Sequence, residues 1–456
     1  MINLFEYQNK VSNSDSLSGL EDFLDDIWSR REKFSYFKQD KSDNSDSQKF
    51  INFLRKTNEI KSNKYVGVIY FQGERINLLP KIFYDPNKKY SENDICQIQN
   101  HFLWYISHCR KIKFPSYLTR QGALSGNFLE ILIFSFSKYA RNLINSLIYQ
   151  QYTEFAGESS FLRGKVNFSD YAKENMSKGK YHKVNCSFDI YDIDNEFNRI
   201  IKYVSNLLFS ITENADSKKY LREILFLFEE VSDVKATAEQ CDKFRFNPIF
   251  GDYEVVRDYC KLFLEYCISY DYKNSLKLFA FLLPMDYVYE DFIYGFIQKE
   301  IDSVSVKPQK VDTYLDEEGA FNLKPDIYIT LGNRFLIADT KYKIVYSNDL
   351  DPKNGISQSD IYQMLAYAVR FKVDKIILFY PNSVLNQQME ESKIVIKDAL
   401  ANNTEITIFA YQLPIIDFKL LESSLDQTFS ISDLFASLKT ILIGRLNNIF
   451  STISIN

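Results

Sequence analysis

The sequence predicts an α/β protein of the mixed α+β kind, with two domains. Its 456 residues exceed the roughly 100–200 residues of one ordinary domain. Hydrophobic residues make up 45% and charged residues 25%, as in globular proteins. From residue 285 onward the patterns follow in the order helix, three strands, helix, strand, which favours a mixed sheet flanked by helices. We place the boundary between residues 170 and 192, so that an N-terminal α+β domain covers 1–180 and a second domain covers 181–456.

The first domain carries both strand and helix patterns. Residues 12–60 are polar and are expected to be helical in parts, with a loop at 40–48. Aromatic and β-branched runs predict strands, and apolar residues at three- and four-residue spacing predict helices. The expected strands are 66–71 and 75–79, the helices are 93–112 and 126–150, and a strand and turn cover 161–168.

The second domain begins with helices and continues into a sheet core at about 285–415. Asp194 is a plausible N-cap for an amphipathic helix that runs to Phe209. Further helices are expected at about 217–232 and 252–268. In the core we expect a helix at 286–300, a strand at 311–315, a hairpin, a helix at 357–371 and strands at 375–380 and 405–411.

The hairpin carries the most informative side chains. Two β-rich runs, 326–331 and 334–341, flank Gly332-Asn333, a pair that is typical of a two-residue hairpin loop. With that loop, Leu331 faces Arg334 and Asp326 lies opposite Asp339. Side chains alternate along a strand, so Lys341 shares a face with Asp339. Opposed side chains lie roughly 5 Å apart at Cβ, so the two carboxylates repel unless a cation lies between them.

These residue types suit a metal-dependent phosphodiesterase. Asp326 and Asp339 would hold a divalent ion, with the Thr340 carbonyl as a further ligand. Magnesium is the expected ion because its ligands are oxygens, and manganese can substitute. Lys341 would orient the attacking water or stabilise its charge. The alternative is an ordinary solvated hairpin with facing acids and a lysine.

Three further side chains are candidates for the same site. Glu290, on the expected helix at 286–300, shares a face with Ile293 and Ile297 and could be another metal ligand, directly or through water. Gln363 and Tyr367 are four apart and lie on one helix face, from which they could reach phosphate or hold Lys341. The alternatives are a helix-edge glutamate and a half-buried amphipathic helix.

Charge and missing motifs exclude several function classes. The net charge of −5 provides no global basic field for unaided DNA binding. There is no G-x-x-x-x-G-K-[ST] loop, so we expect the chain to bind no nucleotide itself. The six cysteines form no Cys-x-x-Cys pair and are expected to be reduced. Without a signal peptide pattern or a long apolar run, the protein is expected to be soluble and cytoplasmic.

The site residues resemble the PD-(D/E)xK nuclease superfamily in its Gln-x-x-x-Tyr variant. Segments outside the site resemble the McrC family, the nuclease subunits of McrBC-type modification-dependent restriction systems. Those segments are Leu79-Pro80-Lys81-Ile82, Leu162-Arg163-Gly164-Lys165-Val166, Cys186 and Asp194…Asn198-Arg199-Ile200-Ile201. The resemblance spans about residues 65–390.

The resemblance implies a magnesium-dependent DNA endonuclease that works with a partner. The N-terminal domain would dock on a McrB-like AAA+ GTPase hexamer that recognises modified cytosine in double-stranded DNA. This chain would stimulate GTP hydrolysis and cut the DNA, with Asp326, Asp339 and Lys341 as the catalytic residues. Two alternatives stay open: a stand-alone repair or recombination nuclease, and a non-catalytic activator of the AAA+ ring.

Overall fold

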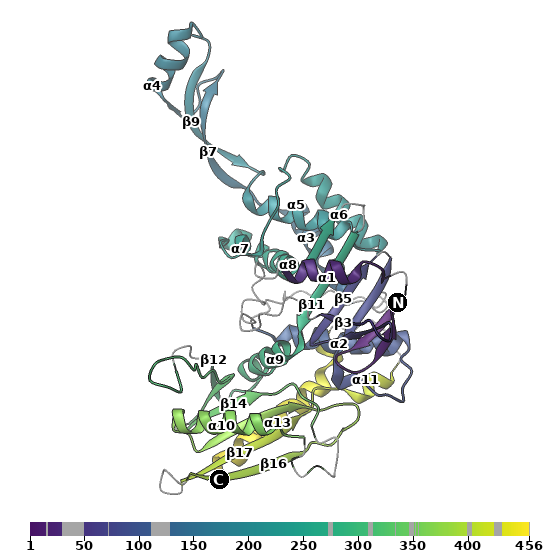
Figure 1. The fold of residues 1–456 in the computed structure, drawn as a ribbon. Helices are drawn as coiled ribbons and strands as arrows, with labels where there is room; N and C mark the ends of the chain where they lie inside the picture. The colour runs from purple at the N-terminus through teal and green to yellow at the C-terminus, as the bar shows by residue number, and fades with distance from the viewer. Residues whose placement is uncertain are drawn as a thin grey trace. The chain divides into compact units, whose positions relative to one another are not determined.

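The structure is a computed structural model. It describes residues 1–456 except 15–16, 30–49, 72, 111–127, 272–276, 309–312, 333, 346–350, 352, 354, 399–403, 424–430 and 456. The chain forms two compact units: Met1–Leu132 together with Glu265–Asn456, and Ile133–Leu264. The boundary predicted near residue 180 lies inside the second of these units, because the chain leaves the first unit and returns to it. The mixed α+β class is as predicted (Figure 1).

The N-terminal part of the first unit is built on a five-stranded sheet with the order β1-β6-β5-β11-β10. Its strands are β1 (Ile2–Phe5), β5 (Tyr65–Phe71), β6 (Glu74–Leu79), β10 (Cys267–Asp271) and β11 (Lys277–Pro284). β1 runs parallel to β6, and β11 runs antiparallel to β5. The strands predicted at 66–71 and 75–79 are therefore confirmed.

The stretch before residue 60 holds more strand than the sequence suggested. It contains β2 (Lys10–Ser12), α1 (Leu20–Ser29), β3 (Ile51–Leu54) and the start of β4 (Glu59–Ser62). β2, β4 and β3 form a small sheet of their own. Trp28 of α1 packs edge-on against Phe50 and Tyr65, so α1 belongs to the core of the N-terminal sheet. The loop predicted at 40–48 lies outside the described residues.

The C-terminal part of the first unit is built on a six-stranded mixed sheet with the order β12-β13-β14-β15-β17-β16. Its strands are β12 (Ser305–Pro308), β13 (Ile327–Leu331), β14 (Arg334–Thr340), β15 (Lys375–Pro381), β16 (Glu391–Asp398) and β17 (Thr404–Leu413). In the centre, β14 runs parallel to β15, and β15 runs parallel to β17. The pairs β12–β13, β13–β14 and β16–β17 are antiparallel.

In this sheet one predicted strand was wrong, and the edge strand β16 was not predicted. The strand expected at 311–315 is absent in its described part: Tyr314 makes only an isolated bridge with Asn322, and 311–312 lie outside the described residues. The edge strand β12 takes its place in the order. β16, the other edge strand, was not predicted, because its alternating apolar residues are few and its neighbours are charged.

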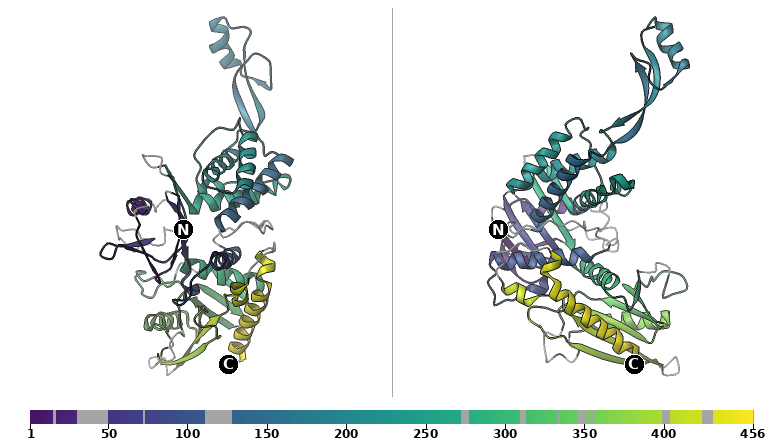
Figure 2. Two further views of the ribbon diagram at one scale, coloured as in Figure 1. Left: turned by 90° about the vertical axis from the view of Figure 1, so that its right-hand side faces the viewer. Right: turned by 180° about the vertical axis from the view of Figure 1, so that it is seen from behind.

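Helices cover both faces of the six-stranded sheet. α10 (Gln358–Phe371) packs Met364 and Ala368 against Ile376 and Leu378 of β15, within one apolar cluster. α13 (Ala436–Ile455) lies on the other face, so that the sheet stands between α10 and α13 (Figure 2). The Ile453 carbonyl there accepts a hydrogen bond from Lys375 Nζ at 3.1 Å.

The helix α9 (Met285–Glu300) connects the two sheets of the first unit. It follows β11 directly, and it contacts β14 of the C-terminal sheet. α9 packs closely on α2 (Glu92–His108), where a Cβ added to Gly295 would lie 1.9 Å from the His108 carbonyl oxygen. Shorter helices in this unit are Lys81–Phe83 (3₁₀), α11 (Phe418–Glu422) and α12 (Ile431–Leu434).

The second unit is helical and carries a long β ribbon. Its helices are α3 (which starts in the first unit, Phe128–Ser146), α5 (Glu196–Phe209), α6 (Ala215–Leu227), α7 (Ala238–Cys241) and α8 (Tyr253–Tyr266). β7 (Gln151–Ser159) pairs with β9 (Val184–Asp192) in a ribbon that extends away from α5, with α4 (Phe168–Asp170) near its far end (Figure 1). β8 (Lys165–Val166) adds two residues to β9.

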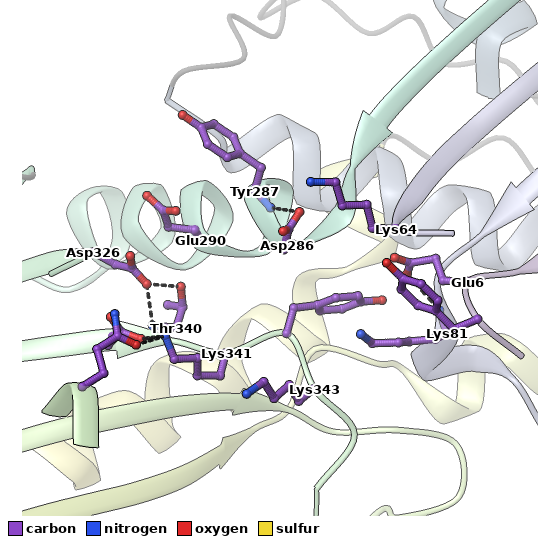
Figure 3. A pocket seen from close by; sticks show the side chains of 14 residues that line it. Glu6, Lys64, Lys81, Asp286, Tyr287, Glu290, Asp326, Thr340, Lys341 and Lys343 are labelled. Atoms are coloured by element: carbon purple, nitrogen blue, oxygen red, sulfur yellow. Dashed lines mark hydrogen bonds and ion pairs between the residues drawn. The ribbon is translucent and has the colours of Figure 1, made fainter. Parts of the chain in front are cut away.

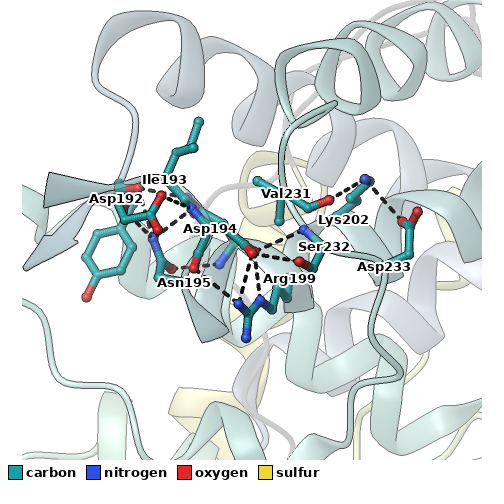
Figure 4. A network of polar contacts seen from close by, with 11 residues as sticks. Asp192, Ile193, Asp194, Asn195, Arg199, Lys202, Val231, Ser232 and Asp233 are labelled. Atoms are coloured by element: carbon teal, nitrogen blue, oxygen red, sulfur yellow. Dashed lines mark hydrogen bonds and ion pairs between the residues drawn. The ribbon is translucent and has the colours of Figure 1, made fainter. Parts of the chain in front are cut away.

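A polar network fixes the base of this ribbon to the helices (Figure 4). Arg199 donates to both Asp194 carboxylate oxygens, at 2.7 and 2.9 Å, and Ser232 donates to the same carboxylate. The N-cap of α5 is Asn195, whose side chain accepts from Asn198 N–H, and not Asp194 as predicted. Asp194 instead binds Arg199, so this sequence segment has an architectural role. In the described residues no helix is long and apolar enough to cross a membrane.

Candidate active site

Two aspartates come together at the edge of β13 and β14, as the hairpin register predicted. Ile327 pairs with Ala338 and Leu331 with Arg334, which is the register of a two-residue loop. Gly332 has φ +59, a conformation that favours glycine, while Asn333 lies outside the described residues. Asp326 immediately precedes β13, and its Oδ2 accepts hydrogen bonds of 2.7 Å from both Thr340 N–H and Thr340 Oγ1. Asp326 therefore lies directly beside the residue that follows Asp339.

Asp339 is buried and has Lys341 as its cation. Its side chain is 1% exposed, and its Oδ2 lies 2.5 Å from Lys341 Nζ. Burial, and then the nearby negative charge of Asp326, raises the pKa of Asp339 well above its usual value. For Lys341, burial acts to lower the pKa, but Asp339 and Asp326 outweigh it and raise the pKa. The pair therefore holds a proton tightly, and the site attracts further positive charge.

A hydrogen-bonded chain from α10 holds the lysine in place. Lys341 Nζ donates to Gln363 Oε1 at 2.9 Å, and Gln363 Nε2 donates to Tyr367 Oη at 2.7 Å. Tyr367 in turn donates to the Lys324 carbonyl at 3.1 Å, just upstream of Asp326. The spacing of four along the helix puts Gln363 and Tyr367 on one face, as predicted. These hydrogen bonds therefore connect Lys341, just after β14, with Lys324, just before β13.

These residues line a cavity of about 450 Å³ (Figure 3). Of the predicted site residues, Glu290, Asp326, Asp339, Thr340, Lys341 and Gln363 line it, and Tyr367 stands behind Gln363. Glu290 projects from α9, and its negative charge contributes to the raised pKa of Asp339. The sequence thus predicted one end of the cavity, and the structure brings these side chains together there.

The other end of the cavity was not predicted. Figure 3 shows Asp326, Glu290 and Thr340 at one end and Glu6 and Lys81 at the other. The additional lining residues are Glu6, Tyr7, Lys64, Lys81, Asp286, Tyr287, Tyr342 and Lys343. Lys81 belongs to a segment that the sequence singled out, but no local pattern could place it beside residues that are far away in the chain.

Two of these residues have partners that explain their positions. Lys343 Nζ donates to both Asp360 oxygens, at 2.7 and 2.8 Å, and so ties the segment after β14 to the start of α10. The Glu6 carboxylate accepts from Lys81 N–H at 3.1 Å. Burial raises the pKa of Glu6 to about 8, against the opposing charge of Lys81.

The donor set fits a hard divalent ion. Asp339 Oδ2 is buried next to Lys341 yet receives no hydrogen bond of ordinary geometry. The described residues hold no group of three His, Cys, Asp or Glu side chains close enough to bind a metal ion together. Magnesium is often held by only one or two carboxylates, with water completing its octahedral shell. The pair Asp326 and Asp339 meets that requirement, and Glu290 lines the same cavity.

Fold and site together define an α+β protein with a carboxylate–lysine cavity on a mixed sheet. The chain belongs to the family described as "McrBC 5-methylcytosine restriction system component", whose model matches residues 60–381, more than half of the chain. This is the family that the sequence segments predicted. No curated protein matches the chain.

One solved structure is similar to this fold over nearly its whole length, and another matches part of it. One is a chain of the refined half-complex from a tetradecameric assembly of Thermococcus gammatolerans McrB AAA+ hexamers with bound McrC. It has a TM-score of 0.65 and 17% identity, and the match covers 98% of this chain and 99% of that chain. Another is a chain of the Thermococcus gammatolerans McrBC complex, with a TM-score of 0.48, 18% identity, and coverage of 65% and 87%. At 17% identity, the similarity to the first of these structures shows the fold alone.

Proposed function

We propose that this protein is the DNA-cutting subunit of a McrBC-like restriction system, a metal-dependent endodeoxyribonuclease that acts with an AAA+ GTPase. The observation that carries the proposal is the closed arrangement of Asp326, Asp339, Lys341, Gln363 and Tyr367 around one cavity. Two adjacent carboxylates with a fixed lysine are groups that metal-dependent hydrolysis of a phosphodiester can use.

Asp326 and Asp339 would hold the ion, which is Mg²⁺ by the chemistry of the oxygen ligands, with Mn²⁺ as a substitute. The Thr340 carbonyl and Glu290 would add to this set, directly or through water. When bound, the ion would neutralise negative charge on the phosphate and lower the pKa of a bound water.

The side chains of this protein would position the water and stabilise the developing charge. Lys341 orients the attacking water and stabilises the negative charge that develops on the phosphate oxygens. Gln363 holds the ammonium group at the correct position through its 2.9 Å hydrogen bond. Tyr367 fixes the Gln363 amide, so that its oxygen and not its nitrogen faces the lysine.

The proposed partner is a McrB-like AAA+ hexamer that hydrolyses GTP and recognises modified cytosine in double-stranded DNA. Family membership supports this, because the family comprises components of 5-methylcytosine restriction systems. The similar solved assembly from Thermococcus gammatolerans contains McrB AAA+ hexamers with bound McrC, which also supports a ring-forming partner. The net charge of −5 agrees with a protein that a partner brings to DNA. We place this activity in the cytoplasm.

The ribbon of the second unit is a suitable docking surface for that partner. Phe161, Leu162, Phe168 and Tyr181, near its far end, are each at least 68% exposed. Several large apolar side chains exposed in one part of a protein are typical of a surface that another protein covers. The ribbon includes part of the range 1–180 in which we expected docking.

The experiment is a DNA cleavage assay with Mg²⁺ and GTP, with and without the AAA+ partner, on methylated and unmethylated duplexes. We expect cutting of methylated DNA only when both proteins are present. Efficient cutting by this chain alone would support a stand-alone repair or recombination nuclease. Restriction that survives Asp326→Ala would support a non-catalytic activator.

A further inference from the structure

One end of the cavity carries lysines from the N-terminal sheet, beside Glu6 and Asp286. Lys64 and Lys81 belong to the region of β5 and β6, whereas Asp326, Asp339 and Lys341 belong to the C-terminal sheet. Both ends line one cavity in the first unit. The site proposed for DNA cleavage is therefore assembled from two sheets.

The strand topology explains why these residues meet. β1 and β6 are parallel, so their carboxyl ends lie at the same edge, where Glu6 and Lys81 follow. Pro284 at the end of β11 pairs with Tyr65, and Met285 N–H donates to the Lys64 carbonyl at 3.1 Å. α9 starts at Met285 and carries Asp286 and Glu290 into the cavity. The N-terminal sheet and the acidic end are thus joined by continuous backbone.

The Lys81 ammonium group lies beside two aromatic rings. Its Nζ lies 4.5 Å from the centroid of the Tyr342 ring and 5.8 Å from that of Tyr7. Within the described part of the chain, its ammonium group forms no direct ion pair, although Glu6 accepts from its backbone N–H and the charges of Glu6 and Asp286 act on it. Aromatic faces attract a cation and leave its N–H donors available. Burial lowers the pKa of Lys81 while Glu6 and Asp286 act against this, so an anion entering the cavity would favour the charged form.

We propose that Lys81 binds a backbone phosphate of DNA next to the phosphodiester that is cut, and so positions the strand across the carboxylate pair. Lys343 also lines the cavity, but its ammonium group is paired with Asp360, so the proposal rests on Lys81. This inference rests on the proposed function, because it assigns the polymer that the cavity accepts. Lys81 is a positioning residue, since the reacting atoms lie at the other end.

The test is a salt titration of DNA binding by the full chain in complex with its AAA+ partner, with a short fluorescent duplex and Ca²⁺ in place of Mg²⁺, so that binding is measured without cutting. Each phosphate contact contributes about 0.9 to the slope of log K against log salt. We expect Lys81→Gln to weaken binding several-fold and to reduce that slope by about 0.9. Lys81→Arg keeps the charge and should keep the slope. The matched control is Lys89→Gln, an exposed lysine in the same segment that does not line the cavity.

An unchanged slope in Lys81→Gln, or an equal loss in Lys89→Gln, would overturn the inference. A second measurement uses the unmodified protein and therefore does not depend on how a variant folds. Bound duplex should protect Lys81, and not Lys89, from an amine-labelling reagent read by mass spectrometry. Equal labelling with and without bound duplex would also overturn it. If Lys81 responds as expected but no DNA is cut under any condition, the phosphate site stands and the proposed cleavage fails.

Discussion

Gln363 Oε1 accepts a 2.9 Å hydrogen bond from Lys341 Nζ, the same ammonium group that lies 2.5 Å from Asp339. This relationship separates two kinds of residue in the candidate site. In the proposed function, Asp326 and Asp339 would offer oxygen atoms to an ion, whereas Gln363 would act only through the lysine. The two kinds should respond differently to substitution.

Metal affinity should depend on the aspartates more than on the amide. Asp326→Asn removes a charged ligand and should weaken Mg²⁺ or Mn²⁺ binding by about tenfold or more. Gln363→Ala leaves both carboxylates in place and should change the affinity less. Isothermal titration calorimetry with Mn²⁺ measures both values, and the reverse ranking would contradict the assigned roles.

Cleavage should depend strongly on Lys341. Lys341→Ala removes the group that stabilises developing negative charge, so cutting by the complete system should fall by about 100-fold or more. This variant should still stimulate GTP hydrolysis by the partner, because the proposed docking surface is the ribbon and not this cavity. Lys397→Ala, an exposed lysine of β16, is the charge-matched control. Full cutting by Lys341→Ala would remove the lysine from the mechanism.

The acidic end of the cavity could be predicted because its signals are local. The Gly332-Asn333 pair sets the loop length, and a period of two then determines which residues face each other. A spacing of four gave the relation of Gln363 to Tyr367. These inferences need only a few neighbouring residues.

The rest of the cavity depends on long-range packing, which leaves no local pattern. Lys81 meets Tyr342 only because β1, β6, β11 and α9 bring two sheets together. The edge strands β12 and β16 were missed for a related reason. Their residues are mixed in polarity, and pairing with β13 and β17 makes them strands.

The ribbon should matter for the partner and not for the cavity. Phe161→Ser combined with Leu162→Ser removes two side chains that are 72% and 70% exposed. We expect a loss of binding to the AAA+ ring and of GTPase stimulation, with Mn²⁺ affinity unchanged. The control is Phe226→Ser, another exposed apolar residue of the second unit, at 75% on α6. Unchanged binding to the ring in the double variant would exclude this surface.

The position of α9 should depend on Gly295. A Cβ there would lie 1.9 Å from the His108 carbonyl oxygen, so Gly295→Ala must push α9 away from α2. We expect the free energy of unfolding to fall by about 1–3 kcal/mol. Cutting should fall as well, because α9 carries Glu290.

The control is Gly444→Ala in α13, where an added Cβ would have nothing within 4 Å. This substitution should instead stabilise the protein by about 0.5–1 kcal/mol through helix propensity. Equal stabilisation by both substitutions, measured by urea unfolding, would contradict the close approach of the helices.

The stability of the first unit should fall in mild acid because of His101. This side chain is fully buried on α2, with Nδ1 2.7 Å from the Gln97 carbonyl and Nε2 accepting from Asp417 N–H at 2.9 Å. Burial lowers its pKa from 6.5 to about 4, although Gln97 and Asp417 act in the opposite direction. The unfolded chain therefore binds the proton first, and the histidine's contribution is complete above pH 6.5 and is lost between 6.5 and about 4. The slope of the unfolding free energy against pH from this group is at most about 1.4 kcal/mol per pH unit.

Urea unfolding across this range should show a smaller slope for His101→Gln than for the unmodified protein, and no change for the exposed His182→Gln. The same slope in all three proteins would show that His101 is not held neutral in the folded state.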